Sequence, residues 1–162
     1  MKAVNMRRHY LFAAVVLTIL SVAELWAKPA VQSNQPPPGQ QGIARPDAIS
    51  IIIDRIIVPP TRDHQVTAFL GLAALKPGDV VQPFRDGASE RIRQPTWFGW
   101  VDDDPEAFFE HPTRYVFIDS ASGAVDVESQ PWWPVLNGAS LWMSGAEWRD
   151  TTLVIYSDIH LR

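Results

Sequence analysis

The fold class is decided by the stretch Arg114-Tyr115-Val116-Phe117-Ile118-Asp119, the following Ser120-Ala121-Ser122-Gly123, and the returning Ala124-Val125-Asp126-Val127-Glu128. The first segment consists of bulky residues that favour strands, and the last alternates apolar with acidic residues. Between them, small and polar residues with Gly123 suit a tight turn, because glycine accepts positive φ. The sequence therefore predicts an antiparallel hairpin over 114–128 whose second strand has one solvent-facing side.

Other segments extend this pattern. Strands are predicted over 49–58, which is rich in β-branched residues and ends at Pro59-Pro60, over 96–101 and over 153–156. The segment 66–75 fits either a helix or a strand followed by a loop, and we favour the strand because Gly71 weakens a helix. Lys76-Pro77-Gly78-Asp79 has the chemistry of a turn, after which Val80 begins a short extended piece.

Helical signals are few. The acids before Pro105 suit the first turn of a short helix over Glu106–Glu110, and the charged segment 85–95 reads as a mobile surface loop. About 120 residues are enough to bury one core. We therefore expect a single small α+β domain over 48–162, a predominantly antiparallel β-sheet with one or two short helices.

The N-terminus has the features of a cleavable signal peptide over 1–27. Lys2, Arg7 and Arg8 precede an apolar run from Leu11 to Leu20 that is too short to span a bilayer of about 30 Å. Cleavage after Ala27 is favoured, and Ala23 is the alternative. We expect a secreted or periplasmic protein that meets a membrane only during export.

Residues 28–47 are predicted to be a disordered Pro/Gln-rich linker, since 32–42 contains no apolar side chain. Removing residues 1–27 takes away three of the 14 Lys and Arg residues and one of the 18 Asp and Glu residues, which leaves a formal charge of −6. This acidic balance disfavours nucleic acid as a partner, because phosphate binding needs clustered Lys and Arg. The chain has no cysteine, so disulfides and thiolate chemistry are excluded.

The tryptophans are the unusual part of the composition. Six of the seven lie beyond residue 27, and each can bury on the order of 200 Å² in a core. The alternative is a binding role, for which the candidates are Trp132, Trp133, Trp97 and Trp100. Adjacent residues of an extended segment face opposite sides, so Trp132 and Trp133 are not expected to line one flat platform, and Trp97 and Trp100 should also differ in side.

Acidic residues and histidines give weaker signals. Asp102, Asp103, Asp104 and Glu106 are candidate ligands for a hard cation, but the run lacks the spacing of a calcium loop and equally suits a helix start. His111 has Glu110 beside it as a possible partner in acid–base chemistry, and a triad set by geometry stays open. Neither a phosphate-cradling loop nor a dinucleotide fingerprint is present, so no cofactor is expected.

The segment Tyr115 to Val125 resembles the strand-turn-strand of PepSY-type and related propeptide domains of exported bacterial hydrolases. In such domains a hydrophobic strand, an Asp and a small turn with Gly precede a returning strand. The resemblance implies a binding, inhibitory or chaperone-like accessory module without catalytic residues.

The leading hypothesis is thus an exported, non-catalytic module that binds a protein or peptide. Strand addition at a sheet edge is its expected mode, with Trp132 and Trp133 as anchors. A carbohydrate-binding module using exposed tryptophans and a small hydrolase centred on His111 are the alternatives.

Overall fold

The structure is a computed structural model that describes residues 42–57 and 64–159. The predicted signal peptide over 1–27 and most of the predicted linker lie outside these residues, as do Val58 and the Pro59-Pro60 pair. Within the described ranges, no helix is long and apolar enough to cross a membrane.

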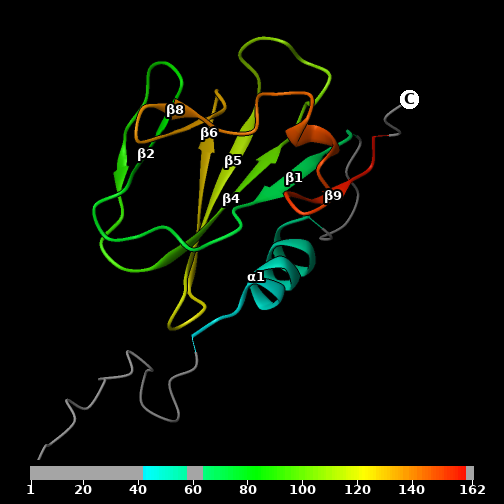
Figure 1. The fold of residues 1–162 in the computed structure, drawn as a ribbon. Helices are drawn as coiled ribbons and strands as arrows, with labels where there is room; N and C mark the ends of the chain where they lie inside the picture. Colours follow the sequence, from blue (N-terminus) through cyan, green and yellow to red (C-terminus); the bar gives the residue numbers. More distant parts are fainter. Residues whose placement is uncertain (1–41, 58–63, 160–162) are drawn as a thin grey trace, which may run out of the picture. The chain divides into compact units, whose positions relative to one another are not determined.

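A five-stranded antiparallel sheet, called sheet A below, forms the centre of the described chain (Figure 1). Its strands follow one another in the order β6-β5-β4-β1-β9. They are β1 (Thr67–Leu70), β4 (Thr96–Asp102), β5 (Thr113–Asp119), β6 (Val125–Gln130) and β9 (Val154–Ser157). The strands predicted at 66–75, 96–101 and 153–156 are confirmed, and so is the antiparallel α+β fold class.

The predicted hairpin is the β5–β6 pair. At its end, the N–H of Asp119 donates to the carbonyl of Ala124 over 2.9 Å, and Gly123 has a φ of 72°. The carboxylate of Asp119 accepts hydrogen bonds from the backbone N–H groups of Ala121 and Ser122 at 2.8 and 2.6 Å. These bonds hold the pKa of Asp119 below its usual value, with the Ser122 N–H as the largest cause. The turn therefore forms as its residue types predict.

A second, four-stranded sheet, called sheet B, has the order β3-β2-β7-β8. Its strands are β2 (Val80–Pro83), β3 (Glu90–Arg91), β7 (Pro134–Leu136) and β8 (Ala139–Ser140). The turn before β2 is confirmed, because the N–H of Asp79 donates to Lys76 O over 3.0 Å and Gly78 has a φ of 100°. The segment predicted as a loop over 85–95 contains β3 and the buried Ile92, so that prediction is corrected in its second half.

The segment from 49 to 57 is helical, which makes the prediction of a strand there wrong. Helix α1 (Arg45–Ile52) begins with Pro46 in its first turn and runs directly into the π-helical turn η1 (Ile53–Ile57). The carboxylate of Asp47 accepts the N–H of Ala44 over 3.1 Å, which satisfies one of the free donors of the first turn. Helix α1 thus includes Arg45, Pro46 and Asp47, which the sequence assigned to the linker.

Packing explains why β-branched residues adopt a helix here. Ala48, Ile52 and Ile57 are at most 1% exposed, whereas Ser50 and Asp54 are exposed. A strand would place Ser50, Ile52 and Asp54 on one face, whereas the helix separates the isoleucine from its polar neighbours. Tertiary burial of one apolar stripe therefore overrides the modest intrinsic preference of isoleucine for strands.

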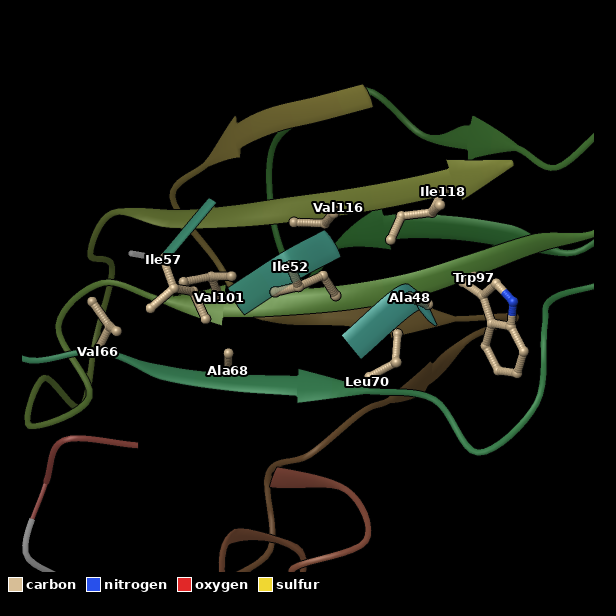
Figure 2. Packing of buried hydrophobic residues seen from close by; sticks show 10 residues of the cluster. All are labelled: Ala48, Ile52, Ile57, Val66, Ala68, Leu70, Trp97, Val101, Val116 and Ile118. Atoms are coloured by element: carbon tan, nitrogen blue, oxygen red, sulfur yellow. The ribbon is translucent and has the colours of Figure 1, made fainter. Parts of the chain in front are cut away.

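Sheet A carries a different apolar cluster on each face. Figure 2 shows the first, in which Ala48, Ile52 and Ile57 pack against sheet residues that include Val101 and Val116. The second cluster lies on the face toward sheet B and contains the alternate residues of the same strands, with Val81 of β2 and the loop residue Trp142; its members are Phe69, Val81, Ile92, Phe98, Trp100, Tyr115, Phe117 and Trp142. Sheet A is therefore buried between α1 and sheet B.

Gly99 allows α1 to lie close to the sheet. A Cβ atom at this position would lie 2.7 Å from Cδ1 of Ile52 and 3.0 Å from the carbonyl oxygen of Phe69. Both distances are shorter than normal contacts, so a larger residue would push the helix away from β4.

The short helix predicted over 106–110 does not form. In its place, the N–H of Ala107 donates to Asp104 O over 2.9 Å, and the carboxylate of Asp102 accepts the N–H of Asp104 over 3.0 Å. Phe108 and Phe109 are 89% and 79% exposed, so a helix here would bury no apolar face. A single helical turn without tertiary packing is too costly to nucleate, and local turn bonds win.

Candidate functional site

Strand β6 forms one edge of sheet A, and no other described strand pairs with its outer side. In an antiparallel pair, residues alternate between those whose backbone groups bond the neighbour and those whose groups point outward. The bond from Asp119 N to Ala124 O fixes this alternation, because it makes 119 and 124 a bonded pair. The N–H and C=O groups of Val125, Val127 and Ser129 are therefore directed away from β5.

The two faces of β6 differ in chemistry. Val125 and Val127 lie opposite Ile118 and Val116, on the face that α1 partly covers. Val127 remains 42% exposed. On the other face, Asp126 and Glu128 lie opposite Phe117 and Tyr115. The edge thus has one apolar flank, formed by Val125 and Val127, and one acidic flank, formed by Asp126 and Glu128. We call these two flanks and the outward backbone groups between them the β6 edge.

An aromatic cluster stands beyond the C-terminal end of β6. The ring of Phe84 stacks on Trp133 at 4.5 Å between centroids and meets the edge of Trp132 at 6.1 Å. The guanidinium of Arg85 lies 5.2 Å from the centroid of Trp132. We call Phe84, Trp132 and Trp133 the aromatic corner. The two tryptophan planes are at 87° to each other, so the corner is a notch and not a flat platform.

Hydrogen bonds hold the backbone of the aromatic corner in place. The carbonyl of Trp132 accepts the hydroxyl of Tyr115 over 2.9 Å and the hydroxyl of Thr113 over 3.2 Å. Burial, followed by the charge of Glu128, raises the pKa of Tyr115, so this phenol remains a donor at neutral pH. Trp132 is thus presented from a fixed backbone.

The other two candidate tryptophans lie in the core. Trp97 is 9% exposed and belongs to the cluster under α1, whereas Trp100 is 1% exposed and belongs to the opposite cluster. They do differ in side, as their spacing predicts. Trp97 donates its indole N–H to Ile43 O over 2.8 Å. Of the four candidates, Trp132 and Trp133 are therefore the ones that a large partner can touch from outside.

The acidic run is divided among separate partners. Asp103 accepts two hydrogen bonds from Arg114, at 2.8 and 2.6 Å, while Asp104 and Glu106 are exposed. Asp102 is 2% exposed and pairs with His111. Within the described ranges, no group of three or more potential ligands is arranged to hold a metal ion.

His111 and Asp102 form a buried pair at the base of the 103–112 loop. Nε2 of His111 lies 3.0 Å from Oδ1 of Asp102, close enough for charge pairing but not aligned for a hydrogen bond. Nδ1 contacts the carbonyl of Phe109, and because a carbonyl only accepts, Nδ1 carries the proton. Burial raises the pKa of Asp102 despite the opposing attraction of His111.

The sequence did not predict this pair. Glu110 was the acid expected to act with His111, whereas in the structure Glu110 is exposed. The signal was present in the strand pattern. Asp102 ends β4, and the strand that follows begins just after His111, with Asp102 opposite Thr113 in the register. Adjacent antiparallel strands bring such ends together.

Comparisons with known proteins found no match. No protein-family model matches the chain, and neither does any curated protein or solved structure.

Proposed function

We propose that this chain is an exported, non-catalytic module that binds an extended peptide segment of a protein partner by strand addition at the β6 edge. The observation that carries the proposal is the open edge of β6, which runs over Val125–Gln130. An added strand would bond the outward backbone groups of Val125, Val127 and Ser129, and those bonds would supply affinity irrespective of side chains.

The two flanks of β6 specify the chemistry of the partner. Side chains of neighbouring strands that lie directly opposite share a face of the sheet. A bound peptide would therefore place alternate residues beside Val125 and Val127, and the intervening ones beside Asp126 and Glu128. The best partner alternates apolar with basic residues. The formal charge of −6 beyond residue 27 also attracts such a segment.

The C-terminal end of the edge gives room for an anchor. A groove of about 650 Å³ lies there, lined by Ser129, Gln130 and Pro131 and by the acidic Glu110 among others. Trp132 follows immediately with its backbone fixed by Tyr115. Large aromatic side chains next to a groove are typical of the residues that dominate binding energy.

The acidic flank also disfavours pairing between two copies of the chain. In a symmetric antiparallel pairing that continues the sheet, Asp126 and Glu128 of both copies would share one face. Like charges on neighbouring strands destabilise the pair. The β6 edge is therefore suited to a partner of opposite charge.

The geometry favours binding over the two alternatives. Nδ1 of His111 donates to Phe109 O, and Nε2 is buried beside the carboxylate of Asp102, so neither ring nitrogen is accessible to a substrate as a base. Trp132 and Trp133 meet at 87°, which does not suit the flat face of a sugar ring. If the resemblance of the hairpin to propeptide domains holds, the partner segment belongs to an exported hydrolase.

A proline substitution gives a sharp test. Val127→Pro removes one outward N–H, and because Val127 does not bond β5, the existing ladder is kept. The matched control is Val127→Thr, which keeps the N–H and the strand preference. Peptides enriched from a random displayed library on the wild-type chain should alternate Lys or Arg with apolar residues. They should bind Val127→Thr normally and Val127→Pro at least tenfold more weakly.

Trp132→Ala should weaken the same peptides without unfolding the chain. Enrichment of acidic or unpatterned peptides would contradict the partner chemistry. Unchanged binding to Val127→Pro would contradict strand addition itself.

A further inference from the structure

A cavity of about 310 Å³ adjoins the acidic flank of the β6 edge. It is lined on one side by residues of the 90–94 segment and on the other by Thr96, Phe117 and Asp126. The latter three belong to β4, β5 and β6, so the cavity crosses three neighbouring strands of sheet A and ends at the edge strand. We call it the β3–β6 cavity.

The floor of this cavity is apolar, and its rim is charged. Phe117 and Ile92 are 7% and 4% exposed and form the floor. Glu90, Arg93 and Asp126 are exposed at the rim, where the polar group of a ligand can reach them. Two carboxylates outnumber one guanidinium there. An apolar floor beneath an acidic rim suits a side chain with a long apolar stem and a cationic head.

Strand addition at the β6 edge would bring one residue of the bound peptide to this cavity. Asp126 lies opposite Phe117, and an added strand would place its own residue opposite Asp126 on the same face. The backbone groups of Asp126 bond β5, so an antiparallel addition makes this a pair without direct hydrogen bonds, in which side chains lie closer. Glu128 does not line the cavity, so one position of the peptide meets it.

Distance selects a long side chain at that position. Adjacent strands lie about 4.8 Å apart, so an added strand would be roughly two spacings away from β5, which carries Phe117. A short side chain opposite Asp126 would end beside that carboxylate, whereas lysine or arginine can cross it and lay its stem on Phe117. An acidic residue is disfavoured, because like charges on neighbouring strands repel each other.

The chemistry of the cavity favours arginine over lysine. An ammonium group is more strongly hydrated than a guanidinium, so placing it above an apolar floor costs more free energy. A guanidinium also packs favourably on an aromatic ring such as that of Phe117. Its five N–H donors can serve two carboxylates from different strands, Glu90 of β3 and Asp126 of β6.

We propose that the β3–β6 cavity is a specificity pocket that selects arginine at the peptide position opposite Asp126. The inference rests on the proposed strand addition at the β6 edge and names one residue of the partner segment. Glu90 and Asp126 bind the guanidinium, while Phe117 and Ile92 pack against its stem. Arg93 at the rim repels the bound cation and lowers the affinity for it.

Two peptides test the pocket. One alternates lysine and valine, and the other has a single lysine replaced by arginine. Both should protect the amides of Val127 and Ser129 from hydrogen exchange, which reports strand addition. The arginine peptide should bind about fivefold more tightly in isothermal titration calorimetry, the gain expected from one cation that packs on an aromatic ring.

Substitutions at the rim separate the pocket from the edge. Glu90→Gln should abolish the preference for arginine, because it removes one carboxylate without changing β6, and Val127 and Ser129 should still be protected. The control Glu106→Gln makes the same change at an exposed residue outside the cavity and should keep the preference. Arg93→Gln should increase the preference, since it removes the opposing charge.

The proposal is overturned if the wild type binds both peptides equally or if Glu90→Gln keeps the preference. It is also overturned if Arg93→Gln weakens the arginine peptide, which would indicate a pocket for an anion. In each of these cases, protection of Val127 and Ser129 would show that strand addition itself holds. If neither peptide protects these amides, strand addition fails and the specificity pocket is refuted with it.

Discussion

Replacing Ile52 by alanine tests whether 45–57 is the helix that covers sheet A. Ile52 is 0% exposed and packs among the residues shown in Figure 2. The change removes three carbon groups, each worth about 0.8 kcal/mol of transfer free energy, and it leaves a cavity in the core. We expect the free energy of unfolding to fall by about 3 kcal/mol, a large part of the roughly 5–15 kcal/mol typical of a domain.

Urea denaturation followed by tryptophan fluorescence measures this loss, and Ser50→Ala is the control. Ser50 is exposed on α1, so its replacement should change the free energy of unfolding by less than about 0.5 kcal/mol. If the segment were a strand, Ile52 would share its face with Ser50 and Asp54 and lie toward solvent. A loss below about 1 kcal/mol for Ile52→Ala would therefore refute the helical assignment.

Two other substitutions probe the fold. Gly99→Val adds side-chain atoms at a position where a Cβ would already lie within 3.0 Å of Ile52 Cδ1 and of the Phe69 carbonyl oxygen. The change should lower the free energy of unfolding by at least about 2 kcal/mol, which thermal melts measure. An unchanged Tm would contradict the close approach of α1 to β4. Asp102→Asn addresses pH: burial raises the pKa of Asp102 in the fold, so its contribution to stability is complete below the ordinary value of 3.8 and is lost as pH rises through the raised value. The free energy of unfolding of the wild type should thus decline between about pH 4 and pH 7. Asp102→Asn should flatten that decline, while the control Asp126→Asn should leave it intact. Equal slopes in all three proteins would contradict the role of the buried Asp102–His111 pair in this pH dependence.

Local chemistry explains which parts of the fold the sequence predicts. The hairpin of β5 and β6 is encoded within 18 consecutive residues by strand formers, Asp119 and Gly123, and the structure reproduces it. The 49–57 segment fails because isoleucine favours strands on its own, whereas the burial of Ile52 against Val101 and Val116 depends on residues far along the chain.

The candidate site likewise has one part that local sequence predicts and another that depends on residues far apart in the chain. The alternation of apolar and acidic residues in β6 is visible in the sequence, so a two-faced strand could be predicted. Whether that strand lies at an edge depends on the order of strands in sheet A, which no local pattern states.

Amide hydrogen exchange of β6 tests the central claim most directly. In the free chain, the amides of Val127 and Ser129 should exchange quickly, while those of Asp126 and Glu128, which bond β5, should be protected. Adding a short peptide that alternates lysine and valine should protect Val127 and Ser129, and a peptide with the same residues in two blocks should not. If the alternating peptide binds and these two amides still exchange as fast as in the free chain, strand addition at the β6 edge is wrong.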